Sequence, residues 1–262
     1  MQMGLKGKTA VVCGSSQGIG RAVAIELAEL GANVTLMARN AQRLESVRAE
    51  LDCNAGQSHE VLVADFSEAA QVKMAIEGFV GGGKSAEILI NNTGGPPGGP
   101  AAEAKTQEFV TAFESHLLCN HLLTTALLPG MKAKKYGRVI NIISTSVKQP
   151  LSGLGVSNTI RGAVANWSKT LANELGGFGI TVNNILPGMT RTGRLDSIIE
   201  SRSKKTGKSV DEVIAAMEAA TPAGRIAEPA EIAAAAAFLA SPAAGYINGI
   251  NLPVDGGRTG CL

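Results

Sequence analysis

The stretch Cys13-Gly14-Ser15-Ser16-Gln17-Gly18-Ile19-Gly20 decides the fold of this chain of 262 residues. It joins Thr9–Cys13, a short run that predicts a strand, to Arg21–Leu30, where apolar residues recur at helical spacing. Glycines here let the backbone turn tightly and approach a ligand, while the start of the helix offers free N–H groups and a positive dipole end. Together these features predict a binding site for the pyrophosphate of a dinucleotide, to which Ser16 adds a hydroxyl donor.

The same alternation of strand and helix continues along the chain. Apolar runs predict strands at Thr9–Cys13, Asn33–Ala38, Glu60–Ala64, Ile88–Asn91, Arg138–Ser144, Ile180–Leu186 and Ile250–Val254. Helical spacing predicts helices at Arg21–Leu30, Gln42–Leu51, Ala69–Val80, Thr106–Lys135, Gly155–Leu175 and Glu231–Ala240. Continuous apolar strands separated by helices imply a parallel sheet covered on both faces. We therefore predict an α/β, doubly wound, Rossmann-type fold of three layers, as one domain over residues 1–262.

Composition narrows the class of protein. Hydrophobic residues make up 45% of the chain and the formal net charge is +2. This balance argues against nucleic-acid binding, which needs concentrated basic charge, and no apolar run reaches the ~20 residues that a membrane-spanning helix needs. The four cysteines lack paired spacing, so we expect neither a metal site nor a disulfide framework. Because Met1–Lys8 lacks the apolar stretch of a secretory signal, we expect a cytoplasmic location.

The residues at the end of the second predicted strand indicate which dinucleotide binds. Met37-Ala38-Arg39-Asn40 contains no carboxylate, whereas NAD-binding versions of this fold place one there to accept hydrogen bonds from the ribose 2′-hydroxyl. Arg39 suits a 2′-phosphate instead, because a guanidinium pairs well with phosphate oxygens. The sequence therefore favours NADP(H), with NAD(H) as the other candidate. The alternative for Arg39 is that it merely caps a surface turn.

Further motifs, in order along nearly the whole chain, resemble those of the short-chain dehydrogenase/reductase family, close to its 3-oxoacyl-acyl-carrier-protein reductase branch. Cys13–Gly20 resembles T-G-x-x-x-G-I-G with Cys in place of Thr, and Asn91–Gly94 resembles N-N-A-G. Pro187–Thr192 resembles the P-G segment beside the nicotinamide, and Val254–Gly257 resembles the C-terminal V-D-G-G. Asp65, followed by Phe66, resembles the Asp that contacts adenine. The cofactor-binding residues expected from the sequence and this resemblance are Gly14, Ser16, Gln17, Gly18, Ile19, Gly20, Arg39, Asp65, Phe66, Asn92, Thr93, Gly94, Arg161, Pro187, Gly188 and Thr192.

The catalytic positions that the resemblance implies depart from the family's Asn, Ser, Tyr and Lys. Ser144 is retained, but the Tyr position falls on Ser157, the Lys position on Arg161 and the Asn position on His116. In the family, Tyr passes a proton to or from the substrate oxygen as hydride moves, while Lys binds the nicotinamide ribose and lowers the Tyr pKa. The catalytic set here therefore reads His116, Ser144, Ser157 and Arg161. His116 is the best remaining acid/base, because imidazole titrates near neutral pH.

Each substituted position also has a structural alternative. His116 lies among apolar residues of a predicted helix and is equally compatible with a buried, hydrogen-bonded core residue. Ser157 could cap or pack at a helix start, and Arg161 could be the partner of a structural ion pair. Arg161 retains ample donors for ribose hydroxyls but cannot act as a proton carrier.

The segment 189–223 follows the sixth predicted strand and matches the region that covers the substrate in the family. Its first part carries basic residues, namely Arg191, Arg194, Arg202, Lys204, Lys205 and Lys208. Such a lid suits an acidic substrate, for example one linked to an acyl carrier or to CoA. The alternative is a solvated basic helix face.

Two functions follow from these observations. The first is an NADP(H)-linked oxidoreductase for a carbonyl/alcohol pair, such as a 3-oxoacyl thioester or another small ketone, with a non-standard catalytic site. The second is a catalytically weak or inactive nucleotide-binding member that acts as a sensor or partner subunit. Under either function, the resemblance implies a homotetramer or homodimer.

Overall fold

The computed structural model describes residues 1–261 and forms a parallel sheet of seven strands in the order β3-β2-β1-β4-β5-β6-β7. The strands are β1 (Thr9–Cys13), β2 (Asn33–Ala38), β3 (Glu60–Val63), β4 (Ile88–Asn91), β5 (Gly137–Ile142), β6 (Ile180–Pro187) and β7 (Asn251–Val254). The strand order reverses at β1, which pairs with β2 on one side and with β4 on the other. Ligands of open α/β sheets bind at the carboxyl ends of the strands at such a reversal. The predicted doubly wound α/β fold is therefore confirmed, and the expected site lies beside the ends of β1 and β4.

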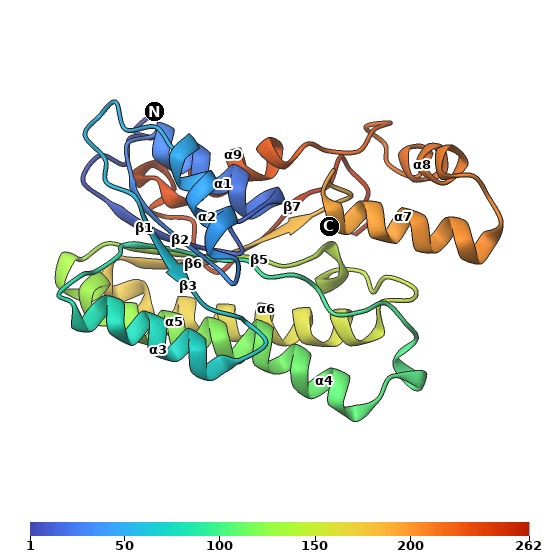
Figure 1. Ribbon diagram of the computed structural model, residues 1–262, viewed down its shortest axis with the longest axis horizontal. Helices are drawn as coiled ribbons and strands as arrows, with labels where there is room; N and C mark the ends of the chain where they lie inside the picture. The colour runs from blue at the N-terminus through green and yellow to red at the C-terminus, as the bar shows by residue number, and fades with distance from the viewer. Residues whose placement is uncertain (262) are drawn as a thin grey trace.

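Helices cover both faces of the sheet, as Figure 1 shows. One face carries α1 (Gly18–Glu29), α2 (Ala41–Glu50) and α9 (Pro229–Ala240), and the other carries α3 (Ala69–Gly81), α5 (Cys119–Lys134) and α6 (Gly155–Leu175). Alternate strand residues supply the two cores: Ile88 and Ile90 of β4 pack on the α1 and α9 side, while Leu89 packs on the α5 side. Short 3-10 turns connect these elements at Ala101–Glu103, Thr145–Val147, Gly176–Phe178 and Pro242–Ala244.

The helical prediction for 106–135 needs one correction. In the structure this segment starts as α4 (Thr106–Phe113). It then passes through a π-helical turn at Glu114–Leu118 and continues as the α-helix α5. An inserted π turn shifts the facing of the side chains that follow it, and such turns are frequent at functional sites. Apolar periodicity alone did not reveal it, because the segment stays helical throughout.

The segment after β6 is largely helical. It contains α7 (Gly193–Thr206) and α8 (Val210–Ala219), which lie together at one end of the molecule (Figure 1). Both helices begin with side-chain caps, from Thr192 and Ser209. Their apolar faces pack on each other in a small separate core of Leu195, Ile199, Val213, Met217 and Ile226.

A ladder of asparagines crosses four neighbouring strands inside the sheet. Asn91, Asn141, Asn184 and Asn251 stand in register on β4, β5, β6 and β7. Their side-chain amides form a chain of hydrogen bonds with donor–acceptor distances of 2.8 to 2.9 Å, joined by Ser168 of α6. Apart from Asn91 Oδ1, which has no partner among the described residues, these buried amide groups are satisfied, so the network helps to fix the register of the four strands.

Within residues 1–261, no helix combines the length and apolar character needed to cross a membrane. The same residues contain no group of three or more His, Cys, Asp or Glu side chains arranged to hold a metal ion.

Candidate active site

The loop between β1 and α1 turns at two glycines in the left-handed region. Gly14 and Gly18 have φ angles of +60° and +56°, which residues with a Cβ rarely adopt. A Cβ at Gly14 would collide with the carbonyl of Asn92, and one at Gly20 would collide with the carbonyl of Gly14. The Asn92 side chain also holds the loop, because its Nδ2 donates to the carbonyls of Cys13 and Gly14 at 3.3 Å. The loop therefore requires glycine at these three positions.

The first turn of α1 keeps its backbone N–H groups available to a ligand. Gln17 occupies the N-cap without a side-chain cap, and no acidic residue follows in the first turn. The starts of α2, α7 and α8 are instead closed by Asn40, Thr192 and Ser209. An uncapped helix start presents orphan donors and a positive dipole end, which suits an anion.

The two serines of the loop have different partners. Ser15 is fully buried, and its Oγ accepts the backbone N–H of Met37 at 3.0 Å, which ties the loop to β2. Ser16 is half-buried and forms no side-chain hydrogen bond with the described residues, so its hydroxyl is free to donate to a ligand.

Two arginines flank the outer side of this loop. Arg39 follows β2, is 77% exposed along its side chain and lies 3.7 Å from the Asp65 carboxylate. Arg43, in the first turn of α2, donates from Nη1 to Gln17 Oε1 at 3.2 Å. The pKa of Asp65 lies below its usual range, mainly because its carboxylate accepts the backbone N–H of Ser67, with help from the Arg39 charge. Sequence reasoning missed Arg43, although its place one turn after Arg39 at a helix start was a usable signal.

His116 is buried inside the π turn and makes one specific contact. It is only 2% exposed, and its Nδ1 lies 2.6 Å from the Thr93 hydroxyl oxygen. Burial, together with the charge of Arg161, lowers the pKa of His116 to about 2. The imidazole is therefore neutral at physiological pH. The expectation that His116 titrates near neutral pH is wrong, because it assumed an accessible side chain.

The two serines of the expected catalytic set lie in different settings. Ser144 follows β5, which ends at Ile142 rather than at the predicted Ser144, and its Oγ accepts the backbone N–H of Ser146 at 3.1 Å. Because that Oγ is an acceptor in this contact, the hydroxyl proton remains free to donate. Ser157 lies in the first turn of α6 but does not cap it, since the N-cap is Leu154. Ser157 forms no side-chain hydrogen bond with the described residues, and it is half-buried.

Arg161 is the most unusual charge of the site. It lies one turn after Ser157 on α6 and is 8% exposed, and its Nη1 donates to the carbonyl of Ile142 at 3.1 Å. None of the ion pairs within residues 1–261 involves Arg161, so the structural ion-pair alternative is wrong. Burial and the neighbouring charge of Arg194 lower the pKa of Arg161 to about 10. The guanidinium thus stays charged at neutral pH without a carboxylate beside it.

Neither tyrosine of the chain takes the place of the missing one. Tyr136 precedes the amino end of β5 and donates from its hydroxyl to the carbonyl of Ala240 at 2.7 Å. Tyr246 lies fully exposed near the C-terminal strand. Within the described residues, the set His116, Ser144, Ser157 and Arg161 therefore contains no phenol.

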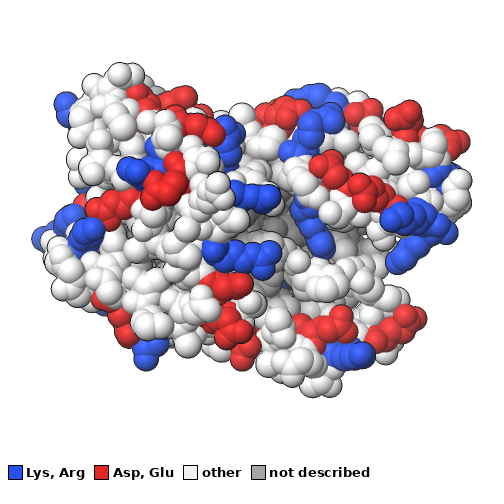
Figure 2. All heavy atoms as spheres, in the orientation of Figure 1, with Lys and Arg blue, Asp and Glu red and all other residues white. Residues whose placement is uncertain are grey.

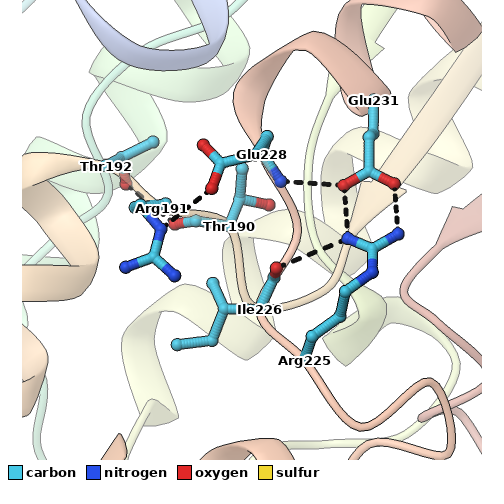
Figure 3. Close-up of polar contacts among 7 residues, drawn as sticks. All are labelled: Thr190, Arg191, Thr192, Arg225, Ile226, Glu228 and Glu231. Atoms are coloured by element: carbon cyan, nitrogen blue, oxygen red, sulfur yellow. Dashed lines mark hydrogen bonds and ion pairs between the residues drawn. The ribbon is translucent and has the colours of Figure 1, made fainter.

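The segment that carries α7 and α8 is fastened at its two ends, as Figure 3 shows. Arg191 donates its backbone N–H to the carbonyl of Ala227 at 2.8 Å, and Ala227 donates in turn to the carbonyl of Met189 at 2.9 Å. Two ion pairs reinforce this base, namely Arg191 with Glu228 and Arg225 with Glu231. These contacts hold the two ends of the segment side by side.

The start of the same segment lies over the phosphate loop. A Cβ at Gly18 would stand 3.2 Å from the methyl carbon of Thr192, and Gly188 donates its N–H to the carbonyl of Val254 at 2.9 Å. Figure 2 shows Lys and Arg side chains gathered around a hollow near the centre of one face, beside the part that carries α7 and α8. The motifs around positions 18, 92, 188 and 254 thus converge on one cleft at the carboxyl ends of the strands.

Comparison with known proteins assigns this cleft to a family. Residues 14–259 match the family model described as enoyl-(acyl carrier protein) reductase. The chain belongs to the short-chain dehydrogenase/reductase family. This short-chain dehydrogenase/reductase is 35% identical over 257 residues to 3-oxoacyl-[acyl-carrier-protein] reductase FabG of Vibrio cholerae, a match that covers 97% of the chain and 98% of that relative.

Solved structures of reductases share the fold. L-sorbose reductase from Gluconobacter frateurii, in complex with NADPH and L-sorbose, superposes with a TM-score of 0.93 at 32% identity and covers 100% of both chains. A 3-oxoacyl (acyl-carrier-protein) reductase from Agrobacterium tumefaciens C58 with NADP bound gives a TM-score of 0.86 at 28% identity, over 97% of this chain and 95% of that one. The predicted family is confirmed, and this short-chain dehydrogenase/reductase is a member of an oxidoreductase family.

Proposed function

We propose that the chain is an NADP(H)-dependent oxidoreductase for a carbonyl/alcohol pair that works without a side-chain proton donor. The observation that carries the proposal is Arg161, a buried guanidinium with no carboxylate beside it, next to an intact cofactor cleft. A buried charge without a counter-ion costs free energy, so its retention at the family's Lys position indicates a functional use. The substrate is a 3-oxoacyl thioester or another small ketone, in keeping with the reductases that the chain resembles.

The residues of the cleft fit NADP(H). The glycine turn and the uncapped start of α1 suit the pyrophosphate, with Ser16 as an added donor. Arg39, just after β2, and Arg43, in the first turn of α2, suit the 2′-phosphate, because a guanidinium donates charge-assisted hydrogen bonds to phosphate oxygens. Arg161 has donors for the hydroxyls of the nicotinamide ribose.

We expect the Arg39→Ala variant to bind NADPH roughly 10- to 100-fold more weakly while its affinity for NADH changes little, because only NADPH carries the phosphate that a charge-assisted hydrogen bond would recognise. Titration of each cofactor by isothermal calorimetry or by nicotinamide fluorescence measures this difference. Arg48→Ala is the matched control, since Arg48 is a partly exposed arginine of the neighbouring helix α2 that, like Arg39, pairs with one carboxylate, that of Glu45. Equal losses for NADPH and NADH would contradict the assignment of Arg39 to the 2′-phosphate.

The chemistry follows from the remaining side chains. NADPH, when bound, supplies a hydride to the carbonyl carbon of the substrate. The carbonyl oxygen then gains negative charge, which the Ser144 hydroxyl and the Arg161 guanidinium stabilise by donating hydrogen bonds. Since His116 is neutral and Ser157 is too weak an acid, water protonates the resulting alkoxide.

A second function rests on the same absence of a proton donor. Losing a positioned acid or base typically costs about 10²–10⁴-fold in rate, which leaves room for a chain that binds the cofactor without useful turnover. Such a chain would be a sensor or a partner subunit of an active reductase. A screen of ketones and alcohols with both cofactors separates the two functions, because only the second predicts tight cofactor binding without turnover. Under either function, we propose a homodimer or homotetramer.

A further inference from the structure

A cavity of about 460 Å³ lies between the loop after β4 and helix α4. Its lining residues include Gly95, Pro96, Lys105, Glu108, Ser115 and His116. Its volume falls in the range of small-molecule sites, and its walls mix apolar surface with a few polar groups, which is typical of such sites. His116 and Ser115, which lie on the same π turn, both line it, so the cavity adjoins one of the expected catalytic positions.

One guanidinium stands beside this cavity, and a second lies on a neighbouring helix. Arg194 of α7 donates from Nη2 to the carbonyl of Pro96 at 2.7 Å, and the same nitrogen lies 3.8 Å from where a Cβ of Gly95 would be. Arg161 lies on α6, which packs on the π turn that carries His116, and burial together with the Arg161 charge lowers the pKa of His116. Arg194 therefore lies beside the cavity wall at Gly95 and Pro96, and Arg161 lies on the helix that packs on the π turn of His116.

The charge of this pair is not balanced by the protein. Within residues 1–261, neither Arg161 nor Arg194 takes part in an ion pair, whereas Arg191 and Arg225, at the base of the same segment, both do. Glu108, an acidic residue of the cavity wall, accepts the backbone N–H of Lys105 at 2.7 Å as part of a helix cap. The Arg194 charge acts unfavourably on the Arg161 charge, so an anion bound near both would be stabilised.

We infer that the substrate of the proposed reduction is an oxo acid, with Arg161 at the reacting oxygen, Arg194 at a carboxylate a few atoms away and the rest of the molecule in the cavity. This inference rests on the proposed function. Hydride addition turns the carbonyl into an alkoxide, water supplies the proton, and the carboxylate passes through unchanged. A guanidinium suits this task, because its planar fork donates two parallel hydrogen bonds to a carboxylate.

The competing use of Arg194 is a contact with the pyrophosphate of the cofactor. In both uses the guanidinium binds an oxyanion, but the two uses affect different binding steps. A cofactor contact acts on the free protein, whereas a substrate contact acts on the protein already saturated with NADPH.

The test measures the affinity of small probes for the full chain saturated with NADPH. Each probe pair compares a carboxylate with the matching uncharged amide: oxamate with oxamide, and succinamate with succinamide. We expect at least one carboxylate to bind roughly tenfold or more tightly than its amide, because hydrogen bonds to a charged group are the stronger ones. In Arg194→Gln this preference should fall to within about threefold, the precision of such comparisons. Lys204→Gln is the matched control, since it removes one exposed positive charge from the same helix and should keep the preference.

Three results overturn the inference. One is equal binding of carboxylate and amide to the wild-type complex. The second is a preference that persists in Arg194→Gln. The third is a loss of NADPH affinity in Arg194→Gln before any probe is added, which would assign Arg194 to the cofactor. Failure of the wild-type chain to bind NADPH would instead reject the proposed function itself.

Discussion

Replacing Arg161 with methionine is expected to lower kcat by about 10²–10³-fold, the loss seen when a donor to a developing oxyanion is removed. The same change should leave the free energy of unfolding unchanged or raise it. Methionine fills a similar volume, and its burial removes a desolvated charge that no carboxylate within the described residues compensates. Steady-state kinetics and urea unfolding of the same preparation measure both effects. The substrate is the carbonyl compound with the highest turnover in a panel of ketones, oxo acids and 3-oxoacyl thioesters.

The Arg161→Lys variant serves as the comparison for charge. It keeps a cation at the position but loses the planar fork, so it should recover part of kcat. If Arg161→Met unfolds more easily and Arg161→Lys recovers no activity, Arg161 is a structural residue and the proposed role fails.

The Gly20→Val variant is expected to weaken NADPH binding by about 100-fold, because displacing the loop removes hydrogen bonds to the charged phosphates, each worth about 1.5–3 kcal/mol. A Cβ at Gly20 would collide with the carbonyl of Gly14, which belongs to the turn that faces the phosphates, so the loop must move. Overpacking of this kind also costs about 1–3 kcal/mol of stability. Cofactor titration and thermal unfolding measure the two effects.

Gly78→Ala is the matched glycine control. Gly78 lies exposed in helix α3, where a Cβ would meet nothing within 4 Å. Alanine there should raise stability by about 0.5–1 kcal/mol through helix propensity and leave NADPH affinity unchanged. NADPH affinity in Gly20→Val close to that of the wild-type chain would show that the loop does not form the phosphate site.

The layout of the fold was predictable because it depends on periodicity. Strands such as Asn33–Ala38 and Ile88–Asn91 occur where the apolar runs predict them, since buried parallel strands are apolar on both faces. The asparagine ladder was not predicted, although each Asn lies in or beside a predicted strand. Its partners come from four strands, and only the register places them together.

The candidate site was predictable in its residues but not in their states. The positions of Ser144 and Arg161 follow from motif spacing, yet nothing in the sequence indicates that Arg161 lacks a carboxylate partner. His116 is the clearest case, because its pKa depends on burial and on Arg161, a neighbour that is distant in sequence. Arg194 gains its significance only through its contact with Pro96, which lies far away along the chain.

The proposed function requires that the chain reduces carbonyls without a side-chain proton donor. The most direct test is the pH dependence of kcat, measured with NADPH and the carbonyl compound that gives the highest turnover in the panel. The pKa of His116 is about 2 and that of Arg161 is about 10, so neither group changes charge between about pH 6 and about pH 9. We therefore expect kcat to be flat across this range. A rise or fall of kcat with pH inside this range would reveal a proton donor that ionises there. Tight NADPH binding without turnover of any compound would show that the chain is not a reductase. Either result would contradict the proposed function.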